Sequence, residues 1–83
     1  MLDPRQIESW IRSGLACEHL SVTGDGRHFE ALIVSAAFNG LSRVQRQQRV
    51  NDVLREHFET ETLHALSMRC LTPAEAKERG LLG

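Results

Sequence analysis

The sequence predicts one α+β domain, in which a three-stranded mixed sheet carries helices on one face. Helical periodicity or capping signals occur in three segments, and apolar residues alternate with polar ones in three others. The resulting order is helix, strand, strand, helix, strand, helix, and the middle helix is long enough to be divided into two pieces. Because this helix joins the second and third strands, those strands can run parallel. We treat residues 1–83 as a single domain with a thin core, as expected for so short a chain.

The first half of the chain reads as a helix followed by a hairpin. Asp3 is a suitable N-cap, and the proline after it is favoured at the first helical position. The apolar face of this helix consists of Ile7, Trp10, Ile11 and Leu15. A strand follows with Leu20 and Val22 on one side. The segment GDGR at 24–27 tolerates positive φ angles and predicts a tight turn into a second strand, from residue 28 to about 35.

The second half predicts two more helical regions around a third strand. A short helical turn at 36–40 precedes a helix from Arg43 to about residue 58, which an N-cap serine opens. The apolar stripe of that helix is predicted to consist of Val44, Val50, Val53, Leu54 and either His57 or Phe58. A third strand is predicted over 63–71. The sequence TPAE at 72–75 is a capping box that begins a short final helix.

Composition and charge argue against several classes of function. The net charge is −1 and the pI is near 6.4, so the chain as a whole has no attraction for nucleic acid or anionic lipid. The apolar run at 31–34 is far shorter than the roughly 20 residues of a membrane span, and no signal peptide is visible. Cys17 and Cys70 form no CxxC pair, which favours free thiols in a reducing cytoplasm. No catalytic triad, carboxylate pair or P-loop is present, so we expect no enzyme activity.

His64 is the most informative single residue. It lies in the third predicted strand, on the same side as Leu66, Met68 and Cys70. A histidine on the apolar side of a strand needs a partner, which is a backbone carbonyl, a carboxylate or a metal. An ordinary hydrogen-bonded histidine at the edge of the core is therefore one interpretation, and a metal ligand is the other.

Several segments, taken together, resemble the BolA family and in particular its IbaG-like bacterial branch. They are VTGDGRHF at 22–29, IVS at 33–35, FNGLSR at 38–43, RQQRV at 46–50, LHALSM at 63–68 and TPAE at 72–75. The resemblance extends over about residues 5 to 79, and it rests on the order and spacing of the segments. It implies an α/β sandwich similar to a type II KH domain, which agrees with the order of elements predicted above.

The resemblance also implies a partner and a shared cofactor. The partner is a cytosolic monothiol glutaredoxin, and the two proteins hold a [2Fe–2S] cluster between them with a glutathione thiol. On this side the resemblance implies His64 as one ligand and a histidine or cysteine in the hairpin turn as another. The turn at 24–27 contains neither. His28, which follows the turn directly, is our candidate for the second ligand.

A second hypothesis is nucleic-acid binding. Arg43, Arg46 and Arg49 recur every three residues on the long helix, with glutamines among them, and both side chains suit phosphates and base edges. The KH-like fold and relatives described as transcriptional regulators point the same way. The net charge and the lack of a GxxG clamp oppose it. The same arginines could simply be solvated, or contact glutaredoxin or glutathione. We expect the isolated protein to be a monomer that binds no membrane.

Overall fold

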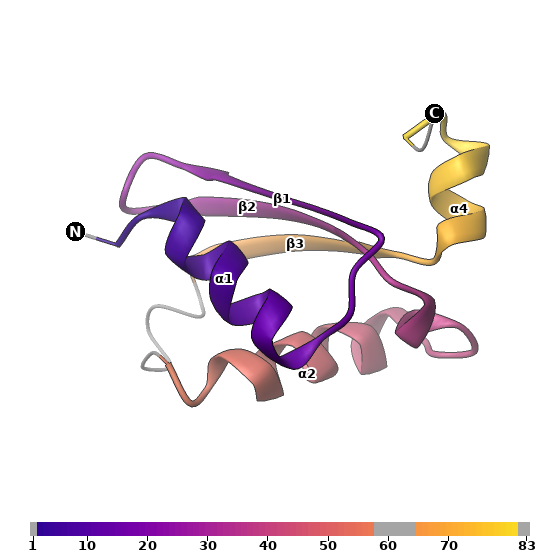
Figure 1. Ribbon diagram of the computed structural model, residues 1–83, viewed down its shortest axis with the longest axis horizontal. Coiled ribbons are helices and arrows are strands. Elements are labelled where there is room, and N and C mark those ends of the chain that lie inside the picture. The colour runs from indigo at the N-terminus through magenta and orange to yellow at the C-terminus, as the bar shows by residue number, and fades with distance from the viewer. Residues whose placement is uncertain (1, 58–64, 82–83) are drawn as a thin grey trace.

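Three α-helices, a short 3₁₀ helix and a three-stranded mixed sheet make up residues 2–57 and 65–81, the parts of the chain that the computed structural model describes (Figure 1). In chain order the elements are α1 (Pro4–Gly14), β1 (His19–Gly24), β2 (Phe29–Val34), the 3₁₀ helix η1 (Ala36–Phe38), α2 (Arg43–Leu54), β3 (Leu66–Leu71) and α4 (Pro73–Glu78). β1 pairs antiparallel with β2, and β2 pairs parallel with β3. The predicted class, mixed sheet and element order are thus confirmed. Within the described ranges, no helix is both long and apolar enough to cross a membrane.

The hairpin between β1 and β2 closes through the turn that the sequence predicted. The Asp25 carboxylate accepts hydrogen bonds from the backbone N–H groups of Arg27 (2.8 Å) and His28 (2.9 Å). The bond from His28 has the larger effect and that from Arg27 the smaller, and both lower the pKa of Asp25 below its usual value. Gly26 has a φ of 97°, a conformation that favours glycine. The turn ends at His28, and β2 begins at the next residue, Phe29.

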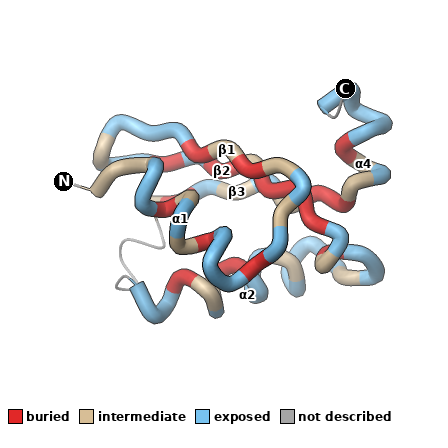
Figure 2. Tube along the Cα trace, viewed as in Figure 1, coloured by how far each residue is buried: buried red, intermediate tan, exposed pale blue. Residues whose placement is uncertain are grey.

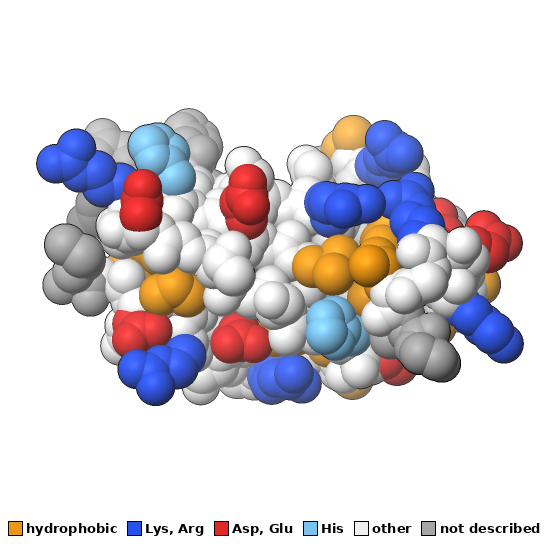
Figure 3. All heavy atoms as spheres, turned by 90° about the horizontal axis from the view of Figure 1, so that it is seen from above, with side chains coloured by type: hydrophobic (Ala, Val, Ile, Leu, Met, Phe, Trp, Pro, Cys, Tyr) orange, Lys and Arg blue, Asp and Glu red, His pale blue; other side chains and the backbone are white. Residues whose placement is uncertain are grey.

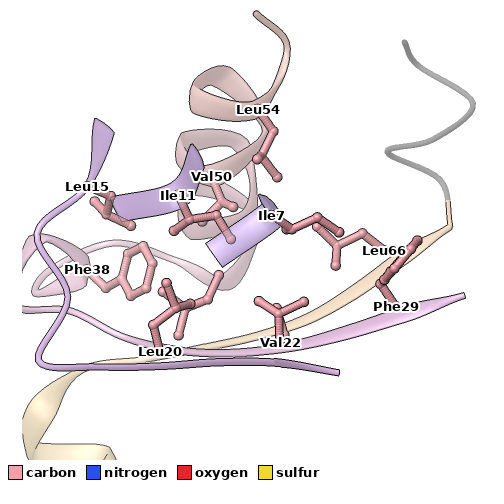
Figure 4. Close-up of a cluster of buried hydrophobic side chains, with 12 residues drawn as sticks. Ile7, Ile11, Leu15, Leu20, Val22, Phe29, Phe38, Val50, Leu54 and Leu66 are labelled. Atoms are coloured by element: carbon pink, nitrogen blue, oxygen red, sulfur yellow. The ribbon is translucent and has the colours of Figure 1, made fainter. Parts of the chain in front are cut away.

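One continuous core lies between the sheet and the helices α1 and α2, as the buried segments in Figure 2 show. The side chains labelled in Figure 4 come from both helices, from all three strands and from η1. They are Ile7, Ile11, Leu15, Leu20, Val22, Phe29, Phe38, Val50, Leu54 and Leu66. The helical and alternating patterns of the sequence thus meet on one side of the sheet.

Helix α4 departs from the prediction that the helices share one face of the sheet. Its Ala76 is buried against Val34 of β2 and Leu71 of β3. The preceding residues of these strands, Ile33 and Cys70, belong to the core under α1 and α2, and successive side chains of a strand point to opposite faces. α4 therefore packs on the other face, at one end of the sheet (Figure 1). The strands end with apolar side chains on both faces, so both faces need a cover there.

Helix α2 ends at Leu54, earlier than predicted. The N–H of His57 donates to the carbonyl of Leu54 (2.9 Å), a three-residue step in place of the four-residue step of an α-helix. The His57 ring stacks on Trp10 of α1, with ring centroids 4.9 Å apart and planes within 8°. The α-helical turn thus ends just before the segment in which His57 packs against α1. Phe58, the other candidate for this end of the stripe, lies outside the described residues.

The apolar stripe of α2 also differs from the prediction at its beginning. Val50 and Leu54 are buried, but Val44 is 64% exposed. Residues four apart share one face of a helix, whereas residues six apart do not, so Arg46 rather than Val44 lies in line with Val50. An arginine therefore occupies an inward position of this helix.

Candidate functional site

The turn between β1 and β2 and the beginning of β3 lie at the same end of the sheet. The N–H of Phe29 donates to the carbonyl of Ala65 (2.9 Å), and Phe29 is paired in register with Leu66. Phe29 follows His28 in the chain, and Ala65 follows His64. The described part of β3 begins at Leu66, later than the predicted residue 63, and His64 itself lies outside the described residues.

His28 is held by its backbone and leaves its imidazole exposed. Its N–H donates to the Asp25 carboxylate (2.9 Å), and its carbonyl accepts from the Asp25 N–H (3.2 Å). His19, the other histidine of the hairpin, pairs with Val34 at the far end of β1. Of these two histidines, His28 alone lies beside the strand end that Ala65 enters. An exposed imidazole on a fixed turn can reach a metal centre brought by another protein.

The two cysteines are poorly prepared to act as ligands in the isolated protein. Burial raises the pKa of the Cys17 thiol above its usual value, and burial raises the pKa of the Cys70 thiol to about 11. The thiolate is the form that binds metal, so both side chains are in the non-ligating form near neutral pH. Among residues 2–57 and 65–81, no three His, Cys, Asp or Glu side chains come together as a metal-binding group.

Arg46 performs an internal role that its sequence pattern does not reveal. Its side chain is only 11% exposed, and its Nε donates to the carbonyl of Leu41 (3.0 Å). Its Nη1 donates both to the carbonyl of Cys70 (3.0 Å) and to Oε1 of Glu75 (2.7 Å). Arg46 thus connects α2 to the loop before it, to β3 and to α4.

The predicted arginine surface of α2 is therefore divided. Arg46 points inward, while Arg43 and Arg49 line two different cavities. Arg49 faces the groove between α1 and α2. Arg43 lines a cavity of about 260 Å³ between α2, β3 and α4, which we call the arginine groove. The arginine groove is lined chiefly by Arg43, Arg46, Met68, Arg69, Glu75 and Arg79.

Arg69 and Arg79 were not candidates from the sequence, although both line the arginine groove. Arg69 lies in a strand and Arg79 caps the C-terminus of the final helix, so neither shares a periodic pattern with Arg43. The alternation of β3 places Arg69 on the face opposite Met68. The sequence offers no corresponding signal that α4 brings Arg79 to the same cavity.

Glu75 should make folding stability sensitive to acid. The N–H of Thr72 and then the Arg46 guanidinium lower the pKa of this carboxyl from 4.5 to about 2. A pKa that is lower in the folded state contributes stability above the unfolded value and loses it as the pH falls towards the folded value. We expect Glu75→Gln to make the free energy of unfolding fall less steeply between pH 4.5 and 2. Urea unfolding at several pH values measures this, and an unchanged slope would contradict it.

Comparison with known proteins identifies the class. Residues 2–75 match the family model described as BolA-like protein. The chain is 37% identical over 83 residues to the acid stress protein IbaG of Escherichia coli K12, covering 99% of both chains. It is 41% identical over 59 residues to the DNA-binding transcriptional regulator BolA of Haemophilus influenzae, covering 71% of this chain and 56% of the other. A BolA homologue from Coxiella burnetii superimposes with a TM-score of 0.80 at 35% identity, covering 93% of this chain and 99% of that one.

The fold and these similarities define a small α+β protein of the BolA type, as the sequence segments predicted. The chain belongs to the BolA family. Its relatives include proteins named as an acid stress protein and as a transcriptional regulator.

Proposed function

We propose that this protein is a non-enzymatic cytoplasmic partner of a monothiol glutaredoxin, and that it co-ligates a [2Fe–2S] cluster in iron–sulfur assembly, trafficking or iron and acid-stress regulation. Its family membership supports the proposal. The observation that supports it most is the hydrogen bond from the Phe29 N–H to the Ala65 carbonyl, because the exposed His28 precedes Phe29 in the chain and His64 precedes Ala65. We propose His64 as the first ligand and His28 as the second, in a protein that is monomeric when alone.

The donor set fits a cluster that is shared with another protein. Glutaredoxin and glutathione supply thiolates, whereas this chain offers imidazoles and keeps its thiols protonated. Imidazole in place of thiolate removes negative charge from a cluster and raises its reduction potential. This chain therefore changes the properties of a partner's cluster by its choice of donor. An imidazole binds metal through the lone pair of its neutral ring, so it adds no charge to the cluster.

The decisive experiment combines the protein with a monothiol glutaredoxin, glutathione, iron and sulfide under anaerobic conditions. We expect a heterodimer whose visible absorbance and circular dichroism differ from those of the glutaredoxin homodimer. His64→Ala should abolish this distinct spectrum, and His28→Ala should weaken it. His19→Ala is the matched control, because His19 lies at the other end of the hairpin. A His64→Ala complex with an unaltered spectrum would rule out this residue as a ligand.

Nucleic-acid binding by the face with Arg43, Arg46 and Arg49 receives less support. The name of the H. influenzae relative favours it. However, Arg46 is engaged inside the protein, and the other two arginines line separate cavities. The continuous basic surface that this hypothesis requires is thus divided. DNA binding that weakens with rising salt and is lost in Arg43→Ala and Arg49→Ala would restore it.

A further inference from the structure

We propose that the arginine groove binds a phosphate monoester group as a dianion, at a site separate from the proposed cluster ligands. The groove lies at the end of the sheet covered by α4, whereas the turn that precedes Phe29 lies at the other end. Figure 3 shows the sheet face opposite α1 and α2, where Lys and Arg side chains gather around an apolar surface towards the α4 end.

The groove holds an excess of positive charge that the described residues do not balance. Four arginines and one carboxylate, that of Glu75, line it. Glu75 is anionic near neutral pH and is already bonded to Arg46 and to the N–H of Thr72. Within residues 2–57 and 65–81, the guanidinium groups of Arg43, Arg69 and Arg79 make no hydrogen bond or ion pair. The whole chain has 10 basic and 11 acidic side chains, so this concentration is local.

Three guanidinium groups without a partner among the described residues surround a small cavity and repel one another, and an anion that enters the cavity relieves this repulsion. The planar guanidinium matches phosphate oxygens in pairs, which a point charge does not. A dianion balances most of the excess, whereas a single carboxylate would leave two charges unpaired. Arg46 is fixed by its three bonds and gives the cavity one rigid wall.

The size and surroundings of the groove favour one phosphate group over a long nucleic acid. The cavity is about 260 Å³, and it is bounded by elements from three parts of the chain. A duplex requires basic contacts along several phosphates. The net charge of the chain is −1, so no overall attraction to a duplex adds to the charge of the groove. The shared ligand chemistry is therefore a terminal phosphate, either free or attached to a small molecule such as a nucleotide.

The first test is a titration of the full chain at pH 8 and constant ionic strength, in which amide NMR shifts report binding. The probes are inorganic phosphate, adenosine 5′-monophosphate and a duplex DNA without terminal phosphates, with chloride as the blank. Saturable shifts around residues 43, 69 and 79 with either of the first two probes support the proposal and identify the source. Arg69→Gln and Arg79→Gln should each weaken binding about tenfold, as loss of a charge-assisted bond predicts. Arg12→Gln on α1 should have no effect.

Thermal unfolding gives an independent readout. In phosphate-free buffer of low salt, Arg79→Gln should raise Tm because it removes repulsion, and it should abolish the increase in Tm that phosphate causes in the wild type. Equal shifts with chloride would overturn the proposal, since they would reflect screening alone. Duplex DNA that binds without competition from phosphate would also overturn it, in favour of a phosphodiester surface. A lack of response to both phosphate probes would do the same.

Discussion

Phe38→Ala is expected to lower the free energy of unfolding by about 4 kcal/mol, as large-to-small substitutions of buried aromatic residues do. The Phe38 ring is 0% exposed and lies in the core beside Leu15 and Leu20 (Figure 4). It comes from η1, a single 3₁₀ turn that has no other fully buried side chain. The substitution leaves a cavity and also frees the connection between β2 and α2. For a chain of this size the loss is about half of the usual stability.

Urea unfolding and thermal unfolding measure this effect. A loss of about 4 kcal/mol corresponds to a decrease in Tm of roughly 15 to 30 °C for a small domain. Val44→Ala serves as the control, because Val44 is apolar but 64% exposed and should cost almost nothing. A Phe38→Ala protein as stable as the Val44→Ala protein would show that η1 is not anchored by this ring.

Arg46→Met should destabilise the protein by about 3 kcal/mol, because it removes three charge-assisted hydrogen bonds to partly buried acceptors. The carbonyls of Leu41 and Cys70 would lose their donor, and Glu75 would lose its counter-ion. Methionine preserves most of the apolar stem, so the change reports on the guanidinium group. Urea denaturation of the isolated protein gives the free energy directly.

Arg49→Met is the matched control for this prediction. Arg49 lies three residues further along α2 and is exposed, so its replacement should change stability by less than about 0.5 kcal/mol. Equal effects of the two substitutions would contradict an internal role for Arg46. In a double-mutant cycle, Arg46→Met and Glu75→Gln should be less harmful together than the sum of their separate effects, because they remove one shared interaction.

The fold was largely predictable because local patterns control it. The N-cap serine of α2 and the capping box at 72–75 involve only neighbouring residues, and both are found in the structure as predicted. The tight turn at Asp25 is likewise a short-range feature. The errors occurred where distant contacts compete with local pattern. Helix α2 ends where His57 meets Trp10, and α4 crosses to the other face because Val34 and Leu71 require a cover there.

The candidate sites were predictable to different degrees. His28 and His64 became candidates through the resemblance of short segments, and pairing of β2 with β3 places Phe29 beside Ala65. Arg46 looked like its neighbours on the helix, because periodicity cannot distinguish a solvated arginine from one that bonds to a strand 24 residues away. For the same reason, periodicity could not predict that Arg69 and Arg79 line one cavity with Arg43.

The order of elements, the hairpin and the helix caps follow from the amino-acid sequence alone, because each depends on residues within one or two turns of one another. The two grooves, the inward position of Arg46 and the meeting of Arg43, Arg69 and Arg79 depend on how helices pack across the sheet. Packing brings together side chains that no spacing rule connects, and charge acts through space rather than along the chain. The chemistry of this small protein therefore depends on contacts between elements as much as on its motifs.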